Sequence, residues 1–485
     1  MPVEVLPQTP AAADEGQGNL ATKLVALYVF LLFGRVLEML QVFGLGGLRL
    51  MVPISIVALV AVFLSGHFLR ALRTPLGVLL VAWTAWMIVC MPFSGWRSES
   101  LNQFANIWLK SLMIFFVVAG LGGAAFAFRK VMSAMGWAAA AACLLVLPGF
   151  SSAGGRPGID RLVGVGTLSN PNEIAFHLWL GMSFLVALLV RGNVAKKVIL
   201  SAICLLELAI TLKTLSREGL LLAFVVVLLA LIRVSFPNKV KIVLASSLVG
   251  LFALATLSPA GLDRYLTVFT HNVSGEAAAS AKASSKAREQ KLRESLELTR
   301  RHPIFGVGMG VFMPASVALA KENGGQGDWE VSHNGYTQVS SELGLPGVLI
   351  LLAIYVTAFR QIARINRAAK RAGREDVRQL AFTLFISLVV LVVHFCFDSI
   401  AYVFYMPLIT GLVAAFSLVY SSAMLEESSV EPIPHLIPVP PLRPAMGNSW
   451  RPALPSPAPP RSKMEPSRNP YRFGRRRNSG PPSKP

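Results

Sequence analysis

The stretch QLAFTLFISLVVLVVHFCF, residues 379–397, contains no Asp, Glu, Lys or Arg. A helix rises about 1.5 Å per residue, so about 17–25 apolar residues in succession cross the roughly 30 Å of a bilayer core. Working outward from this stretch, we find eleven further blocks of similar kind. Their repetition along the chain predicts an all-α, polytopic membrane helix bundle of about twelve transmembrane helices. The predicted spans lie near residues 21–43, 48–65, 75–92, 105–122, 130–149, 172–190, 197–212, 218–234, 240–257, 343–359, 379–397 and 401–420.

The composition agrees with a membrane protein. Of the 485 residues, 54% are hydrophobic and 14% are charged, and the mean hydropathy is +0.59. Soluble domains carry roughly 25% charged residues. The formal net charge of +20 would suit nucleic-acid binding, but the basic residues lie in short connectors and in the C-terminal tail. This placement is typical of membrane topology, so we expect no nucleic-acid partner.

Positive charge follows every second predicted span. By the positive-inside rule, these connectors and both chain ends are expected in the cytoplasm. The connector between the ninth and tenth spans is then one large loop on the other, outer side. The basic residues in question are Arg70, Arg73, Arg129, Lys130, Arg191, Lys196, Lys197, Arg233, Lys239, Lys241, Arg360, Arg364, Arg367, Lys370, Arg371, Arg374 and Arg378.

These features divide the chain into four regions. Residues 1–20 are a polar cytoplasmic N-terminus without the basic start of a signal peptide, so the first apolar block is expected to remain as a helix. Residues 21–155 hold the N-terminal transmembrane helices. Residues 156–420, with the outer loop 258–342, form the region richest in polar motifs. Residues 421–485 are Pro-rich and basic, which predicts a disordered cytoplasmic tail near anionic lipid.

The cysteines show no metal-binding or disulfide pattern. Cys90, Cys143, Cys204 and Cys396 each fall inside an apolar block, which favours buried packing thiols. The Gly-rich run HPIFGVGMGVF (302–312) lacks the spacing of a dinucleotide fingerprint and predicts a tight turn in the outer loop. We therefore expect neither a metal ion nor a cofactor.

Arginine on the outer side breaks the charge rule. Arg161 lies in DRLVGVGTLSNPNE (160–173), and Arg217 lies in KTLSREG (213–219). A single Arg of this kind could cap a helix or reach the interface. Several together favour a shared anionic partner, because the planar guanidinium matches phosphate oxygens.

The outer loop adds Arg288 in SSKAREQKLRESLELTRRHP (284–303), which is expected to be helical. A helical wheel predicts that Arg288 points inward, either to a ligand or to a buried ion pair. The predicted inward neighbours are Leu292, Ser295, Leu296 and Thr299. The residues predicted to face water are Glu289, Gln290, Lys291, Arg293, Glu294, Glu297, Arg300 and Arg301.

Two histidines are candidates for proton chemistry. His333 precedes Asn334 in SHNGYTQVSSELGLPG (332–347), and its near-neutral pKa suits a general base. His394 and Asp398 are four residues apart, which would place them on one helix face. They would form either a catalytic pair or a hydrogen-bonded pair that orders the bundle.

In these motifs the chain resembles the O-antigen ligase and O-antigen polymerase family of bacterial membrane glycosyltransferases. RLVGVGTLSNPNEIA, TLSREG, the Arg followed by HPIFGVGMGVF, and SHNGYTQVSSELGLPG are similar to family segments in order and spacing, over about residues 156–357. Weaker likeness extends to His394 and Asp398.

The resemblance implies an enzyme of the bacterial cytoplasmic (inner) membrane, acting in polysaccharide or lipopolysaccharide biosynthesis. It would transfer a glycan from undecaprenyl diphosphate to an acceptor hydroxyl, on a glycan or a lipid, with inversion at the sugar carbon. Arg161, Arg217 and Arg288 would hold the diphosphate, and His333 would be the base. The remaining residues carried over are Asn172 and Asn334 as substrate ligands, with Glu342, His394 and Asp398 as supporting residues.

Other functions remain open at this stage. A ligase and a polymerase of this family would use the same donor chemistry. A transporter or lipid flippase would suit twelve spans, although no inverted repeat is visible. A membrane scaffold that recruits a partner through its tail is a further alternative. Glu218 directly follows Arg217 and could pair with an Arg, which would weaken a phosphate-binding role.

Overall fold

The computed structural model describes residues 14–39, 51–64, 66–121, 125–147, 161–163, 168–268, 270 and 275–429. These residues form helices joined by short connections. The helices are α1 (Asp14–Phe33), α2 (Val36–Met39), α3 (Met51–Leu64), α4 (His67–Leu72), α5 (Pro75–Cys90), α6 (Arg97–Gln103), α7 (Leu109–Leu121), α8 (Ala125–Val146), α9 (Pro171–Arg191), α10 (Val194–Lys213), α11 (Arg217–Arg233), α12 (Phe236–Thr256), α13 (Pro259–Leu266), α14 (Glu276–Arg301), α15 (Phe312–Glu322), α16 (Gly335–Arg371), α17 (Glu375–His394) and α18 (Tyr405–Ser429).

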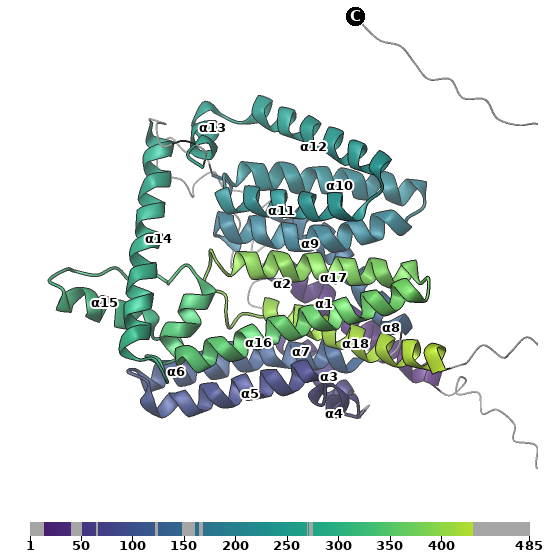
Figure 1. Ribbon diagram of the computed structural model, residues 1–485, viewed down its shortest axis with the longest axis horizontal. Coiled ribbons are helices and arrows are strands. Elements are labelled where there is room, and N and C mark those ends of the chain that lie inside the picture. The colour runs from purple at the N-terminus through teal and green to yellow at the C-terminus, as the bar shows by residue number, and fades with distance from the viewer. Residues whose placement is uncertain are drawn as a thin grey trace, which may run out of the picture. The chain divides into compact units, whose positions relative to one another are not determined.

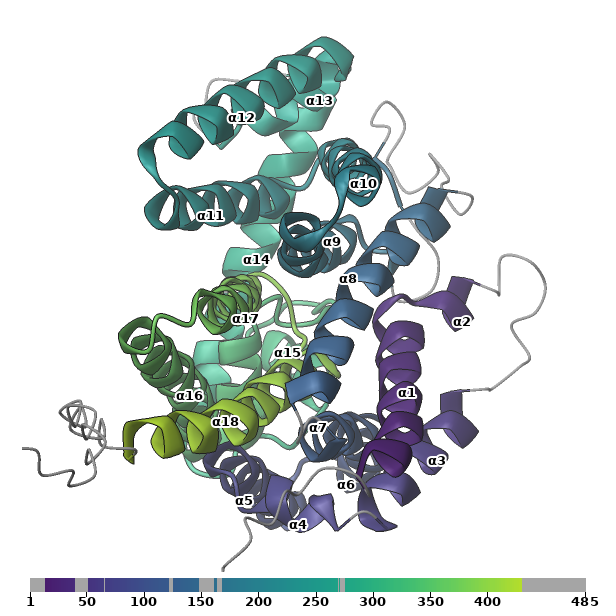
Figure 2. The same ribbon diagram turned by 90° about the vertical axis from the view of Figure 1, so that its right-hand side faces the viewer.

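The long helices run side by side, and α14 crosses one end of the bundle (Figure 1). We call this the α14 end. Figure 2 views the helices from the opposite end, where α9 lies among α8, α10, α11 and α17 and packs against all four. The described part of the chain is thus one helical bundle with a cap of α13, α14 and α15.

Many of these helices suit a bilayer. Among the described residues, six helices are long and apolar enough to cross a membrane, and shorter apolar helices cover 20–33, 51–64 and 405–421. Large apolar side chains face outward, with Ile232 70% exposed and Leu248 69% exposed. Exposure of this extent fits lipid contact better than water contact. The all-helical membrane fold is therefore confirmed, whereas the number of twelve spans stays a prediction.

Helices α9, α11 and α16 each begin at the α14 end with a polar cap. Asn170 accepts a hydrogen bond from the Asn172 N–H at 2.9 Å, with Pro171 as the first residue of α9. Ser216 accepts from the Gly219 N–H at 3.1 Å to start α11, and Asn334 accepts from the Tyr336 N–H at 3.0 Å to start α16. Such caps satisfy free backbone N–H groups. They also leave three positive helix-dipole ends at this end of the bundle.

Basic connectors meet at the opposite end. Arg129, at the start of α8, and Arg374 both pair with Asp376 in the first turn of α17, and Arg191 donates to the Asp376 carbonyl. Arg233, at the end of α11, pairs with Glu375. Connectors after several predicted spans therefore lie at one end, as the predicted topology requires.

The first predicted span, 21–43, is wrong in its extent. Helix α1 ends at Phe33, because Arg35 adopts a left-handed backbone (φ 53°). Its guanidinium turns into the bundle, donates to the Tyr405 hydroxyl at 3.0 Å and lies over the Phe404 ring. The rest of the predicted span, from residue 40, lies outside the described residues.

The tenth predicted span, 343–359, and the outer loop also differ from the structure. Helix α16 begins at Gly335 and continues to Arg371, with a kink at Gly344 (φ 71°, ψ −176°). The predicted loop 258–342 contains α13, α14 and α15 and is well structured over its described residues. Helix α18 continues to Ser429, past the predicted tail boundary at 421. Tail residues 430–485 lie outside the described part of the chain.

Candidate active site

A cavity of about 560 Å³ opens at the α14 end, beside the start of α11, the middle of α14 and the segment before α16. It brings together four residues predicted from the sequence, namely Arg217, Arg288, His333 and Asn334. The other lining residues are Glu218, Leu221, Thr267, Val268, Ser285, Glu289, Leu292, Ser332, Cys396 and Phe397.

Arg217 is the first residue of α11, next to the Ser216 cap. Its guanidinium reaches α14, where Nη2 donates to the Ala281 carbonyl at 3.2 Å and to Ser285 Oγ at 3.0 Å. Neither partner is an anion, so the positive charge is not neutralised by these contacts. A helix N-terminus beside a free guanidinium is a favourable place for phosphate oxygens.

Arg288 points into the cavity from α14 and has no hydrogen-bond or ion-pair partner among the described residues. The wheel prediction for the rest of α14 is partly wrong. Lys291 is buried, 2% exposed, and pairs with Glu294, whereas Leu292 and Leu296 are exposed. The reason is tertiary, because Lys291 also donates to Ser316 of α15 and to the Asp328 carbonyl.

Arg161 lies beside the cavity rather than in its lining. Its Nε donates to the Thr214 carbonyl at 3.0 Å, in the α10–α11 turn. Burial and the positive charge of Arg264 lower the pKa of Arg161 to about 10, with smaller effects from Arg288 and Arg217. Arg161 therefore stays charged at neutral pH, close to other guanidinium groups.

Arg264, in α13, was not identified from the sequence. It is 5% exposed, its Nε donates to the Leu215 carbonyl at 3.1 Å, and its Nη1 has no partner among the described residues. Burial and the charge of Arg217 lower the pKa of Arg264 to about 10. The available signal was an Arg in the short amphipathic segment PAGLDRYL (259–266), directly after an apolar block.

His333 is held by the end of α17. Ser332 Oγ lies 2.8 Å from Ser399 Oγ, Asn334 Nδ2 donates to the Cys396 carbonyl at 3.3 Å, and the Gly335 N–H donates to the Phe395 carbonyl at 2.7 Å. His333 itself has a left-handed backbone (φ 54°), which is uncommon for a residue other than Gly. Strain of this kind clusters at functional sites.

The imidazole of His333 suits a base. Burial, and next the positive charge of Arg288, lower the pKa of His333 below its ordinary value. Asp398 and Glu330 act in the opposite direction with smaller effects. The ring is therefore neutral at pH 7 and able to accept a proton.

His394 does not pair with Asp398. Helix α17 ends at His394, so the four-residue spacing no longer places both side chains on one helix face. His394 Nδ1 instead bonds to Glu218, and its ring stacks on Phe176. Asp398 accepts from the Ser399 N–H at 2.8 Å. Glu218 is thus engaged by His394, and among the described residues it forms no ion pair with an Arg.

The remaining predicted residues lie outside the cavity lining. Asn172 accepts from Ser216 Oγ at 2.7 Å and so links α9 to the start of α11. Glu342 is 2% exposed and accepts from the Phe312 N–H at 3.2 Å, at the start of α15. Their predicted roles in the site remain predictions.

The Gly-rich run does more than turn the chain, because its backbone is hydrogen-bonded to α16. The Val307 and Gly308 N–H groups donate to the Ser341 and Glu342 carbonyls of α16 at 2.8 and 3.0 Å. Gly306 has φ 67°, and a Cβ there would lie 2.3 Å from the Glu342 carbonyl carbon. Glycine is therefore required where the outer segment packs on α16.

The thiols agree only in part with the prediction. Cys90 and Cys143 are buried, Cys204 is half-buried, and Cys396 is exposed at the cavity. The prediction for Cys396 is wrong because α17 ends two residues before it. Across the described residues no group of His, Cys, Asp and Glu could hold a metal ion.

Part of the chain matches a model of a known protein family. Residues 200–352 match the family model described as O-antigen ligase. This range includes Arg217, Arg264, Arg288 and His333. No curated protein matches the chain. The resemblance that the sequence motifs indicated is therefore confirmed at the level of the family.

Proposed function

This chain carries an O-antigen ligase domain at residues 200–352, and on that premise we propose that it transfers a glycan from undecaprenyl diphosphate to an acceptor hydroxyl. The acceptor is a lipid or a glycan, and the reaction takes place at the outer face of the bacterial cytoplasmic membrane. The observation that carries the proposal is a cavity lined by Arg217, Arg288 and His333, with Arg161 and Arg264 close enough to these arginines to interact with their charges.

The geometry supports a division of roles. His333 accepts the proton of the acceptor hydroxyl, and the hydroxyl oxygen forms a bond to the anomeric carbon of the donor. The bond from that carbon to the diphosphate breaks, and its electron pair leaves on the diphosphate oxygen. Arg217 and Arg288 contact the leaving group, while Arg161 and Arg264 add positive charge behind them. Preorganised charge of this kind stabilises the transition state.

The proposed mechanism draws its positive charge from guanidinium groups and requires no metal ion. Four guanidinium groups near one diphosphate are comparable in charge to the metal ions that serve other phosphate chemistries. The apolar residues of the cavity, including Leu221 and Phe397, would face the lipid part of the donor. The oriented start of α11 adds a helix dipole to the same anion.

The orientation follows from the two ends of the bundle. The paired basic connectors Arg129, Arg191 and Arg233 lie at the end opposite α14. If that end faces the cytoplasm, as positive-inside topology requires, the cavity opens on the outer side, where undecaprenyl-linked glycans are consumed. Cysteine labelling of Ser285→Cys in intact cells would check this orientation, with Cys396→Ala as the background and as the unlabelled control, since Cys396 is also exposed.

The decisive test is His333→Ala. We expect a loss of transfer of about 100-fold or more, because a positioned base contributes 10²- to 10⁴-fold. The assay uses purified protein, carrier-linked glycan and acceptor lipid, with the amount of folded protein matched between variants. Transfer at the wild-type rate would overturn the assignment of the base.

Ligase and polymerase are separated by deleting the gene and examining surface glycans on a gel. Loss of glycan from the acceptor, with long carrier-linked chains retained, identifies a ligase. Surface glycan reduced to single units identifies a polymerase of the same family. An unchanged glycan pattern would overturn both functions.

A further inference from the structure

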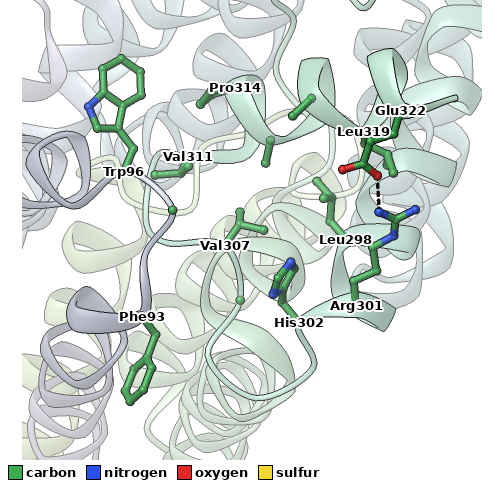
Figure 3. Close-up of a pocket in the computed structure, with 14 residues that line it drawn as sticks. Phe93, Trp96, Leu298, Arg301, His302, Val307, Val311, Pro314, Leu319 and Glu322 are labelled. Carbon is green, nitrogen blue, oxygen red and sulfur yellow. Dashed lines mark hydrogen bonds and ion pairs between the residues drawn. The ribbon is translucent and has the colours of Figure 1, made fainter. Parts of the chain in front are cut away.

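A second cavity, of about 440 Å³, lies at the α14 end and is not used by the proposed reaction. Figure 3 shows that it lies between Trp96, from the α5–α6 connection, and the pair formed by Arg301 and Glu322. Leu298 and Val307 form the floor between these two sides, and His302 projects from the end of α14.

The walls of this cavity are held in place by contacts of their own. The Gly95 N–H donates to the Val307 carbonyl at 3.0 Å, which fastens the connection before α6 to the Gly-rich run. Arg301 Nη1 donates to Glu322 at 2.5 Å and joins α14 to α15. Leu298, Val307, Val311, Phe312 and Leu319 form a small separate core beneath. The cavity is therefore preformed, as ligand pockets usually are.

The second cavity has an aromatic ring on one side and an ion pair on the other. Trp96 is 47% exposed and offers a flat apolar ring with a polar N–H edge. On the other side, Arg301 and Glu322 offer donors and acceptors together, with no net charge between them. An acyl chain would remove these polar groups from water without replacing their hydrogen bonds, which is costly. An anion gains little from a neutral pair.

A sugar ring matches both sides. A pyranose has an apolar C–H face, which can pack on an indole, and hydroxyl groups at its edge. Those hydroxyls can both donate and accept, so they can bond to a guanidinium and a carboxylate at once. The ligand class that best fits this cavity is therefore a neutral polyhydroxylated ring.

The position of the cavity relates it to the transfer site. Arg288 and Arg301 are thirteen residues apart in α14, which is about 20 Å along the helix axis. They also project from different sides of α14, because thirteen residues do not complete a whole number of turns. A single sugar at the transfer site cannot occupy this cavity, whereas a chain of several sugars can reach it.

We propose that the cavity between Trp96 and the Arg301–Glu322 pair binds one sugar ring of a glycan chain, several units away from the sugar that reacts at His333. This inference rests on the proposed glycan transfer. It adds a subsite that recognises chain length, because only longer glycans gain the second contact.

The test compares Trp96→Ala with Trp329→Ala. Trp329 is an exposed tryptophan between α15 and α16 that does not line the cavity, so it is a matched control. Donors carrying one repeat unit and donors carrying several are assayed separately with the same acceptor. For Trp96→Ala we expect KM for the long donor to rise about tenfold, since a packed aromatic contributes about 1.4 kcal/mol. Its kcat, and both constants for the short donor, should stay near wild type.

A second variant addresses folding. Glu322→Gln keeps the shape of the side chain but removes the charge, and Arg301 keeps its pairing with Glu297. We expect the same selective rise in KM with an unchanged melting temperature. An equal loss for short and long donors, or an equal loss in Trp329→Ala, would overturn the proposal.

Binding without turnover separates this inference from the proposed function. The probe is free oligosaccharide of several repeat units, released by mild acid from the carrier lipid, with oligosaccharide from the acceptor lipid in a parallel arm. Saturation-transfer NMR on purified wild-type protein should detect one of the two, which identifies donor or acceptor chain, and Trp96→Ala should lose the signal. No signal in either arm would overturn the subsite. Binding here with no transfer activity would instead count against the proposed function alone.

Discussion

The arginines of the candidate active site differ from the arginines that surround the start of α17 at the opposite end of the bundle. At the end opposite α14, Arg129, Arg233 and Arg378 each pair with Asp376 or Glu375 at the start of α17. At the α14 end, Arg217 and Arg288 have no carboxylate partner among the described residues, and buried Arg264 leaves Nη1 unbonded. The first set forms ion pairs within the protein, whereas the second set forms none among the described residues, as the proposed binding of a diphosphate requires.

This comparison suggests a criterion for this protein. An Arg that is paired with a carboxylate stabilises the fold, whereas an unpaired Arg is a candidate for ligand binding. A paired surface Arg contributes at most about 1 kcal/mol and anchors a helix end. Unpaired guanidinium groups that repel one another lower stability, and such an arrangement persists where it serves a ligand. An Arg in the sequence therefore indicates a role only once its partners in the structure are known.

The largest expected effect is the loss of activity on removing Arg288. If activity is not lost, the distinction between the two sets of arginines is wrong. Arg288→Ala should lower glycan transfer about 100-fold, as the loss of one transition-state donor does. Arg300→Ala, at an exposed position of the same helix, and Arg233→Ala, at the opposite end, should stay within about twofold of wild type. Arg288→Lys should recover little, because the planar fork is lost. Equal losses at the two ends would show that the distinction is wrong.

A smaller effect tests the need for an anion directly. Inorganic pyrophosphate at saturating concentration should raise the melting temperature of the purified protein by about 2 °C or more, since a ligand that binds only the folded state stabilises it. Arg264→Ala should reduce this shift and Arg233→Ala should retain it. Differential scanning fluorimetry provides the measurement. A shift of the same size in both variants would remove Arg264 from the anion site.

The smallest expected effect is a change in the pH dependence of transfer. It tests whether the charge of Arg288 acts on His333. The base is active when neutral, so transfer falls as the pH drops through the pKa of His333. Burial and the charge of Arg288 lower that pKa. Arg288→Ala should therefore raise it and move the acidic limb of the kcat/KM profile to higher pH. Residual activity of the variant from pH 5 to 8 gives the measurement. A shift to lower pH would contradict the contact.

Much of the site could be predicted from local sequence. His333 and Asn334 lie together in one motif, and Arg217 follows a Ser cap, so short-range patterns identify them. The exposed face of α14 could not be predicted in the same way, because Lys291 is buried by contacts to α15 and Asp328. A helical wheel assumes one apolar side, and a buried ion pair violates that assumption.

The sequence by itself determined the class of molecule, because runs of apolar residues long enough for a bilayer are a local property of the chain. Its motifs, in a fixed order, also indicated the resemblance to the O-antigen ligase family, whose model matches residues 200–352. Only the tertiary structure decided that Glu218 binds His394, that Arg264 joins the other arginines, and that Trp96 lines one cavity with the Arg301–Glu322 pair. These partners are distant along the chain, and packing alone brings them together.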